Sequence, residues 1–95
     1  MDPLIHEPVR LKILIMLIKH GELSFKELLD YVGTTEGNLS RHAQKLEEAG
    51  YIEIVKFFEG KRPKTLFRIT EEGSKALKMY LDEIERMLKE IKNEG

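Results

Sequence analysis

The stretch Thr34–Ile52, TTEGNLSRHAQKLEEAGYI, places its apolar and polar side chains on opposite faces of one predicted helix. The apolar side chains recur at helical spacing, so we expect them to face a hydrophobic core. They are Leu39, Ala43, Leu46 and Ala49. The opposite face makes the helix a candidate for contact with nucleic acid, because its groups can hydrogen-bond to base edges and phosphates. They are Thr35, Asn38, Ser40, Arg41, Gln44 and Lys45.

A hairpin is predicted to follow this helix at once, over the sequence EIVKFFEGKRPKTLFRIT. β-Branched and aromatic residues predict strands over Tyr51–Phe58 and Thr65–Ile69. The turn between them, residues 59–63, contains Gly60 for a positive φ and Pro63 as a strand breaker. The hairpin is therefore expected to end in a projecting tip.

Basic charge is concentrated in the hairpin. The 95 residues carry a formal net charge of −1, which by itself argues against strong non-specific binding to nucleic acid. Salt limits the reach of a charge to about 8–10 Å, however, so local charge decides. Residues 54–69 contain five basic side chains against one acid, Glu59. The basic residues are Lys56, Lys61, Arg62, Lys64 and Arg68. A polar-faced helix beside a basic hairpin predicts a DNA-binding surface.

Two more helices are predicted before Thr34. The first starts near Pro8, runs to about His20 and stops at Gly21. Its centre, Ile13–Ile18, is apolar on all sides, so we expect it to be covered on two sides.

A capping box, SFKE, begins at Ser24 and predicts the start of the second helix. It is expected to run to about Val32 and to end at Gly33, after which one of the two following threonines caps the next helix. Residues 22–24 are candidates for a short strand before it. Two helices joined by a three-residue turn have the spacing of a helix-turn-helix unit.

The C-terminal residues 70–93 are predicted to form one long helix whose apolar side chains recur near heptad spacing. The apolar stripe is about 21 Å long at 1.5 Å per residue, which is more than a domain of this size covers alone. Together with the apolar first helix, it favours a two-fold dimer. The predicted interface residues are Ile15, Ile18, Leu77, Tyr80, Leu81, Ile84, Met87, Leu88 and Ile91.

The whole pattern resembles the winged helix-turn-helix transcriptional regulators, with the closest likeness to small archaeal and bacterial members of the MarR and ArsR type. The resemblance rests on HEPVRLKILIMLI (residues 6–18), NLSRHAQKLEEAGYI (residues 38–52) and the basic hairpin. It covers almost the whole chain, from about Leu4 to Ile91.

The resemblance implies a mostly α-helical α+β fold with a three-helix core, a two-stranded β wing and a long C-terminal helix for dimerisation. Residues 1–95 would form a single winged-helix domain. Within it, residues 33–50 would hold the turn and recognition helix, residues 51–69 the wing and residues 70–93 the C-terminal helix.

The resemblance also implies sequence-specific binding of double-stranded DNA by a homodimeric transcriptional regulator. The recognition helix would enter the major groove and the wing would lie on the adjoining backbone or minor groove. A symmetric dimer would bind a pseudo-palindromic operator with half-sites about 10 bp or a multiple apart. The predicted DNA-binding residues are Thr34, Thr35, Asn38, Ser40, Arg41, Gln44, Lys45, Lys61, Arg62 and Lys64. Arg41 is the candidate for a guanine or phosphate contact.

Each of these residues also has a simpler interpretation. The polar helix face could be solvated only, and capping alone explains the two threonines. The cations at the hairpin tip could protect an edge strand from aggregation. His42 is expected to pack partly buried or to touch a phosphate. Phe57 and Phe58 are expected to pack in the core or at the base of the wing, although one of them could be exposed.

The alternative function is a winged-helix protein-interaction module that does not bind DNA, which the near-zero net charge and the apolar first helix favour. The sequence shows no Ser/His/acid set or phosphate-binding glycine loop, so no enzyme is predicted. No cofactor is predicted. The chain has no cysteine, and its three histidines lack ligand spacing, so no metal is expected. The reduced dimerisation region argues against a small-molecule effector pocket.

The absence of cysteine, of a basic-plus-apolar leader and of any long apolar run predicts a cytoplasmic protein without a membrane segment. Heavy use of Lys and Glu with few Asn and Gln is typical of heat-adapted proteins.

Overall fold

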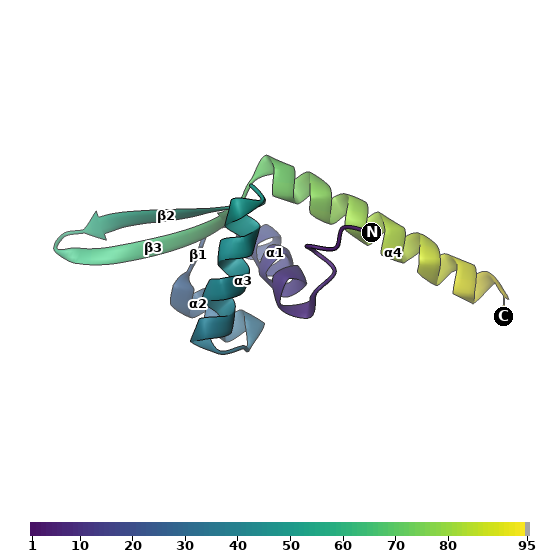
Figure 1. The fold of residues 1–95 in the computed structure, drawn as a ribbon, viewed down its shortest axis with the longest axis horizontal. Helices are drawn as coiled ribbons and strands as arrows, with labels where there is room; N and C mark the ends of the chain where they lie inside the picture. The colour runs from purple at the N-terminus through teal and green to yellow at the C-terminus, as the bar shows by residue number, and fades with distance from the viewer. Residues whose placement is uncertain (95) are drawn as a thin grey trace.

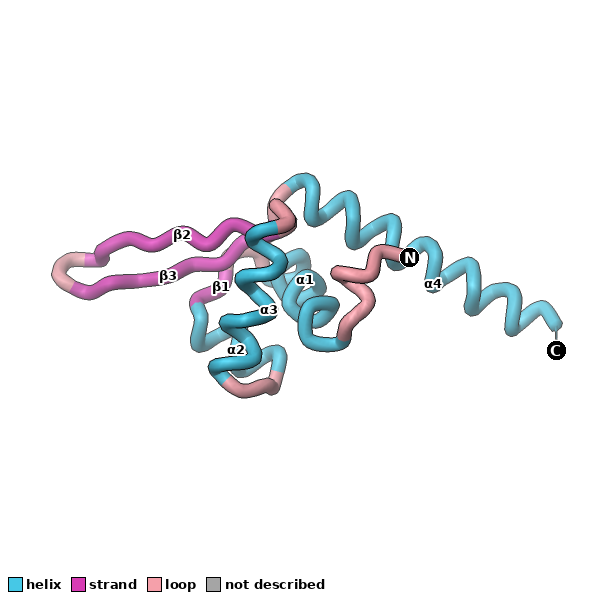
Figure 2. Tube along the Cα trace, viewed as in Figure 1, coloured by secondary structure: helices cyan, strands magenta, loops and turns pink. Residues whose placement is uncertain are grey.

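A computed structural model describes residues 1–94 of the chain, and its fold is mostly helical with one small sheet (Figure 1; Figure 2). The elements are α1 (Pro8–His20), β1 (Leu23–Ser24), α2 (Phe25–Val32), α3 (Glu36–Glu48), β2 (Ile52–Glu59), β3 (Arg62–Ile69) and α4 (Glu71–Glu94). The strands form an antiparallel sheet in the order β1-β3-β2. The predicted α+β winged-helix class is confirmed, and the short strand predicted before the second helix adds a third strand to the wing sheet.

Local capping signals set the helix boundaries as predicted. Ser24 accepts a hydrogen bond from the Glu27 backbone N–H at 3.2 Å, and the Glu27 carboxylate accepts one from the Ser24 backbone N–H at 2.9 Å. Gly33 ends α2 with a φ of 72°, where a side chain would be strained. Of the two threonines, Thr35 caps α3 by accepting from the Asn38 N–H at 3.2 Å.

The core is formed where α1, α3 and the base of the sheet meet. Its largest fully buried side chains are Ile5, Ile13, Leu14, Leu17, Leu28, Leu39, Leu46 and Leu77. The prediction that Ala49 belongs to this core is wrong. Helix α3 ends at Glu48, and the turn through Gly50, with a φ of 79°, directs Ala49 to solvent.

The wing turn is tighter than predicted. Glu59 pairs with Arg62 across the hairpin, so the loop contains only Gly60 and Lys61. Gly60 has a φ of 64° at the first loop position, as a type II′ turn requires. Pro63 is therefore part of β3 and does not break it. Strand β1 pairs with β3 only at Leu23↔Phe67 and Ser24↔Leu66, so Pro63 lies on a free edge that tolerates the missing N–H.

The start of α4 is locked to the corner between α3 and β2. The Thr70 hydroxyl donates to the Gly50 carbonyl at 2.6 Å, and its backbone N–H donates to the Tyr51 carbonyl at 3.0 Å. Gly73 lies so close that a Cβ there would collide with the Tyr51 carbonyl oxygen. This corner sets the direction in which α4 leaves the domain.

The residues before α1 tie the N-terminus to the same corner and to α4. Tyr51 donates its hydroxyl to the Asp2 carboxylate at 2.6 Å, and this bond raises the pKa of Tyr51 to about 12. His6 Nδ1 lies 2.8 Å from the Tyr80 hydroxyl, and the N-terminal ammonium lies 3.2 Å from Glu83. Two of these contacts hold α4 against the N-terminal residues, and the third holds those residues against the corner.

Helix α4 divides into a buried proximal part and a projecting distal part. Leu77 and Tyr80 are only 1% and 5% exposed, so the prediction that they belong to a dimer surface is wrong: they fill the core of their own chain. Ile84 still packs against the core, and the side chains of residues 85–93 are exposed. The C-terminal part of α4 extends away from the domain (Figure 1), and the molecule measures 60 × 25 × 20 Å. Within residues 1–94, no helix is both long and apolar enough to cross a bilayer.

Candidate nucleic-acid interface

The outward face of α3 carries the side chains predicted to contact DNA. Leu39, Ala43 and Leu46 are buried and fix the opposite face of the helix on the core. The side chains of Thr35, Ser40, Arg41, Gln44 and Lys45 are exposed, whereas Thr34 and Asn38 are half-buried. The structure therefore presents all seven from one helix and its preceding turn.

Three of these side chains form a hydrogen-bonded chain. Arg41 Nη2 donates to Asn38 Oδ1 at 2.9 Å, and Asn38 Nδ2 donates to Thr34 Oγ1 at 3.4 Å. The guanidinium is thereby held over the first turn of α3, with its other N–H groups open to a ligand. A planar fork with fixed orientation suits a guanine edge or a phosphate.

Gly37 is a feature of this face that the sequence analysis missed. It lies one helical turn before Arg41, and open space surrounds the position of its absent Cβ. A glycine inside an exposed helix is destabilising by about 0.5–1 kcal/mol relative to alanine. In return, the missing side chain lets another molecule approach the α3 backbone closely. The sequence signal for this feature is a glycine within a helix that has a polar face.

His42 is held on the inner edge of α3 by two residues that the sequence analysis did not select. Its Nδ1 lies 2.9 Å from Arg10 Nη1 and 3.5 Å from the Glu7 carboxylate. Burial of the ring lowers the pKa of His42, although the Glu7 carboxylate acts in the opposite direction. The neutral ring accepts the Arg10 hydrogen bond. His42 therefore packs at the base of the helix, which is the first of the two roles expected for it.

Glu7 connects this cluster to the start of α1. Its carboxylate accepts hydrogen bonds from the backbone N–H groups of Val9 at 3.1 Å and Arg10 at 2.8 Å. Burial alone would raise the pKa of Glu7, but these two backbone bonds lower it below its ordinary value. Arg10 Nε also donates to the Leu4 carbonyl at 2.6 Å. The position of α3 is therefore coupled to the N-terminal end of α1.

The wing presents its cations unequally. Lys61, Arg62 and Lys64 are exposed near the tip, as predicted. Arg68, at the base, instead binds the carboxylates of Glu22 at 3.0 Å and Glu53 at 3.1 Å. It fastens β1 and β2 to β3 and adds little positive charge to the wing.

The two phenylalanines of the wing do not pack as predicted. Phe58 is 73% exposed and Phe57 is 38% exposed. Both lie in the part of the hairpin beyond the core, where no helix covers the sheet (Figure 2).

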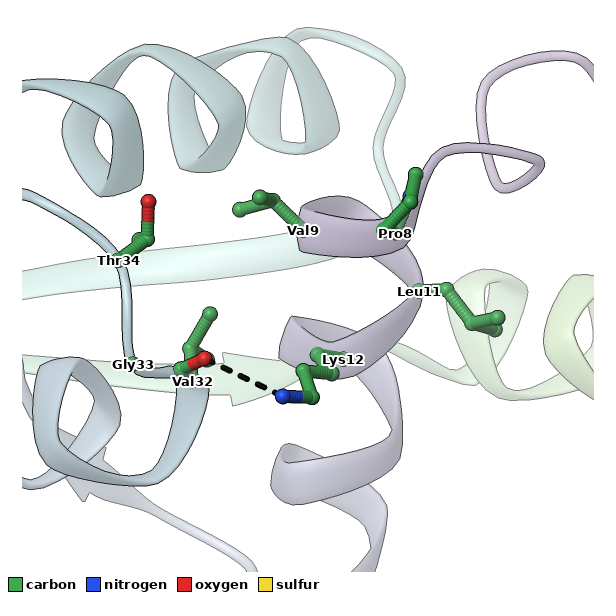
Figure 3. Close-up of a pocket in the computed structure, with 7 residues that line it drawn as sticks. All are labelled: Pro8, Val9, Leu11, Lys12, Val32, Gly33 and Thr34. Carbon is green, nitrogen blue, oxygen red and sulfur yellow. Dashed lines mark hydrogen bonds between the residues drawn. The ribbon is translucent and has the colours of Figure 1, made fainter.

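A cavity of about 380 Å³ opens beside the helix-turn-helix turn (Figure 3). It is lined by Pro8, Val9, Leu11, Lys12, Val32, Gly33 and Thr34. The Lys12 ammonium donates a long hydrogen bond, 3.4 Å, to the Val32 carbonyl at the end of α2. The cavity adjoins the Thr34 end of the hydrogen-bonded chain. Within residues 1–94, no group of three or more His, Cys, Asp or Glu side chains could hold a metal ion.

The remaining residues of the predicted dimer surface are accessible to different degrees. Ile15 and Ile84 are half-buried. The exposed members are Ile18, Leu81, Met87, Leu88 and Ile91, of which Ile91 is 68% exposed. The exposed part of the stripe thus lies mainly on the distal half of α4.

Known proteins share both the sequence pattern and the fold. An uncharacterized protein of Methanocaldococcus jannaschii is 40% identical over 83 residues, which cover 87% of this chain and 90% of that protein. The structure of a transcriptional regulator homologue from Pyrococcus horikoshii OT3 matches with a TM-score of 0.88 and 28% identity, over 95% of this chain and 89% of that one.

Structures of more distant regulators share the fold. Bacillus subtilis PadR, solved in complex with operator DNA, matches with a TM-score of 0.69 and 21% identity over 79% of this chain and 48% of its own length. MarR matches with a TM-score of 0.75 and 23% identity over 87% of this chain and 60% of its own.

A model of the family described as winged helix DNA-binding domain matches residues 9–88. This span runs from the first turn of α1 into the distal half of α4, so it includes the α3 face, the wing and the core that positions them. The resemblance to winged helix-turn-helix regulators is confirmed, and this chain belongs to the winged helix DNA-binding domain family.

Proposed function

We propose that this protein is a homodimeric transcriptional regulator that binds a pseudo-palindromic operator sequence-specifically. Helix α3 enters the major groove, and the wing tip lies on the adjoining backbone or minor groove. The observation that carries the proposal is the Thr34–Asn38–Arg41 chain on the outward face of α3. It orients a guanidinium on a helix face that is polar and makes no core contacts. The shared fold with a regulator solved in complex with operator DNA supports double-stranded DNA as the partner.

The individual contacts follow from side-chain chemistry. Arg41 contacts a guanine edge or clamps a phosphate, and Gln44 contacts an adjacent base. Each bidentate base contact contributes about 1–3 kcal/mol of discrimination. Lys45 and the wing-tip cations Lys61, Arg62 and Lys64 bind phosphates. The backbone N–H groups at the N-terminus of α3 can also bind a phosphate.

The dimer forms through the distal half of α4 together with the outer face of α1. A helix that projects from its domain with exposed Leu81, Leu88 and Ile91 leaves apolar area that a second copy would cover. Ile15 and Ile18 on α1 extend the same surface. A two-fold axis through this surface places one α3 on each side of the dimer.

The test of DNA binding is a fluorescence-anisotropy titration against random 24-bp duplexes over a series of salt concentrations. The parent should lose affinity steeply with salt, and Lys61→Ala/Arg62→Ala should reduce the slope of log affinity against log salt by about 1.8, two phosphates at 0.9 each. The matched control is Lys75→Ala on α4, which should leave the slope unchanged. Equal binding by the parent and Arg41→Ala to all duplexes, including an operator selected from the pool, would refute the sequence-specific contact.

The test of the dimer is sedimentation velocity. Leu88→Glu should shift the parent from dimer to monomer, because the carboxylate would be buried in an apolar interface. Met79→Glu is the control, since Met79 is exposed on the other side of α4. A monomeric parent that binds no duplex at low salt would favour the second candidate, a protein-interaction module, which the exposed apolar half of α4 and the net charge of −1 support.

A further inference from the structure

The tip of the wing exposes an aromatic side chain that the fold does not use. Phe58 is 73% exposed, one residue before the end of β2, and pairs across the hairpin with Pro63, which is also exposed. A large aromatic ring in this position loses the roughly 1.5–3 kcal/mol that burial in a core would contribute. Charged or polar residues normally protect such an edge. The pair of Phe58 and Pro63 is therefore an apolar patch on the most projecting part of the domain.

The register of the hairpin determines which way this patch faces. Side chains alternate along a strand, and directly paired residues share a face. Phe58 and Pro63 therefore lie on the same face as the pair Ile54 and Phe67, which packs on the core between the helices and the sheet. Phe57 lies on the opposite face, paired with Lys64. The exposed ring is thus on the face of the wing that continues from the helical side of the domain.

Cations border the ring along its own face and at the tip. Lys56 shares the face of Phe58, two residues earlier, and Lys61 lies in the turn. Arg62 and Lys64 lie on the opposite face of the same narrow hairpin, paired with Glu59 and Phe57. An apolar ring bordered by cations is complementary to a surface that offers both stacked planar groups and anions, and duplex DNA has both.

The dimensions of the minor groove allow contact with side chains of the wing tip but not with the ribbon itself. A two-stranded ribbon fits the major groove of B-form DNA, but the minor groove is only about 6 Å wide and admits side chains of the tip alone. The Gly60–Lys61 loop closes the hairpin one residue pair beyond Phe58 and Pro63, so both side chains lie close to the tip.

We propose, on the basis of the DNA-binding function proposed above, that Phe58 inserts between two base pairs in the minor groove and bends the duplex. Pro63 supports the ring from the neighbouring strand, while Lys61 and Arg62 bind the phosphates on either side. Insertion partly unstacks one base step, opens the minor groove there and bends the duplex toward the major groove. Pyrimidine–purine steps such as TA unstack most easily, so the wing selects sequence by deformability where α3 selects by hydrogen bonds.

The experiment uses the full chain and a 24-bp alternating A·T duplex in which several adenines are replaced by 2-aminopurine. Because every second step is TA, the signal does not depend on where the protein binds. Fluorescence of 2-aminopurine reports unstacking, energy transfer between dyes at the two ends reports bending, and anisotropy reports affinity. The variants are Phe58→Ser and Phe58→Leu, with Phe57→Ser as the matched control on the opposite face.

For the parent we expect increased 2-aminopurine fluorescence and increased energy transfer on binding. Phe58→Ser should lose both signals and bind about tenfold more weakly, as expected for loss of one stacked aromatic contact. Its salt dependence should not change, because no cation is removed. Phe58→Leu should retain part of both signals, since an aliphatic wedge also opens a step, and Phe57→Ser should behave as the parent.

Two results would overturn the insertion while leaving the proposed function intact. One is salt-dependent binding by the parent without either optical signal. The other is a Phe58→Ser variant that keeps both signals, or that alters the sedimentation coefficient of the free protein, which would assign the ring to contact with a second copy. Absence of any duplex binding by the parent would instead refute the proposed function itself.

Discussion

Helix α3 and the wing carry the two halves of the proposed DNA surface, and the fold holds them in opposite ways. Helix α3 is fixed along its inner face by Leu39 and Leu46, and Arg41 is oriented by Asn38. The distal wing is held by its strand ladder alone, with Phe58 uncovered at the tip. In the proposed function, this difference means that α3 would present fixed geometry for base contacts, whereas the wing would extend the contact along the groove.

The largest contrast should appear in stability. Leu46→Ala removes a fully buried side chain from the base of α3 and should cost about 2–5 kcal/mol in the free energy of unfolding. Phe58→Ser removes an exposed side chain and should stay within about 0.5 kcal/mol of the parent. Urea denaturation followed by circular dichroism measures both. A loss above about 1 kcal/mol in Phe58→Ser would mean that the wing tip is packed in solution, contrary to the comparison.

Replacing Gly73 with alanine tests whether the corner between α3 and the wing holds α4, and the same change at Gly37 serves as the comparison. Gly73→Ala places a methyl group against the Tyr51 carbonyl and should cost about 1–3 kcal/mol, because backbone on both sides must move. Gly37→Ala, on the open face of α3, should instead stabilise the protein by about 0.5–1 kcal/mol. Thermal unfolding of the two variants gives the signs directly, and a neutral Gly73→Ala would show that the corner does not lock α4.

The fixed geometry of α3 predicts energetic coupling between Asn38 and Arg41. In a double-mutant cycle on operator affinity, Asn38→Ala and Arg41→Ala should be non-additive by about 1 kcal/mol, because Asn38 acts partly by holding the guanidinium. Lys61 and Arg41 belong to different elements and should be additive within about 0.5 kcal/mol. Additivity in both pairs would mean that Arg41 is oriented by DNA alone.

The smallest expected effect is a pH dependence at the base of α3. Since burial lowers the pKa of His42 in the folded state, the unfolded chain takes up the proton first as the pH falls below about 6.5. The stability associated with the neutral ring is thus fully present above that pH and is lost as the pH falls through the folded pKa. His42→Asn should flatten the stability profile between pH 7 and pH 5, while the lowered pKa values of Glu7 and Glu27 act only below about pH 4.5. An unchanged slope in His42→Asn would contradict the prediction.

Sequence patterns were sufficient for features that depend on neighbouring residues. The capping box at Ser24, the helix end at Gly33 and the apolar face of α3 are each defined within about one or two helical turns, and the structure contains all three. The basic tip of the hairpin could equally be predicted from the sequence, because Gly60 and the surrounding cations are adjacent in the chain.

The tertiary structure decided which side chains remain free for a partner. Arg68 was counted from the sequence as one of the wing cations. In the fold its guanidinium binds Glu22, which is 46 residues away in the chain. Tyr80 was predicted as an interface residue, but the fold buries it against His6 and the core. Phe57 and Phe58 were predicted to pack in the core or at the wing base, although one of the two could be exposed, and the fold leaves both exposed. The residue sequence thus determined the elements and the class of partner, since these depend on local propensity and local charge. Exposure and pairing depend on residues far apart in the chain, and only the packed fold brings those together.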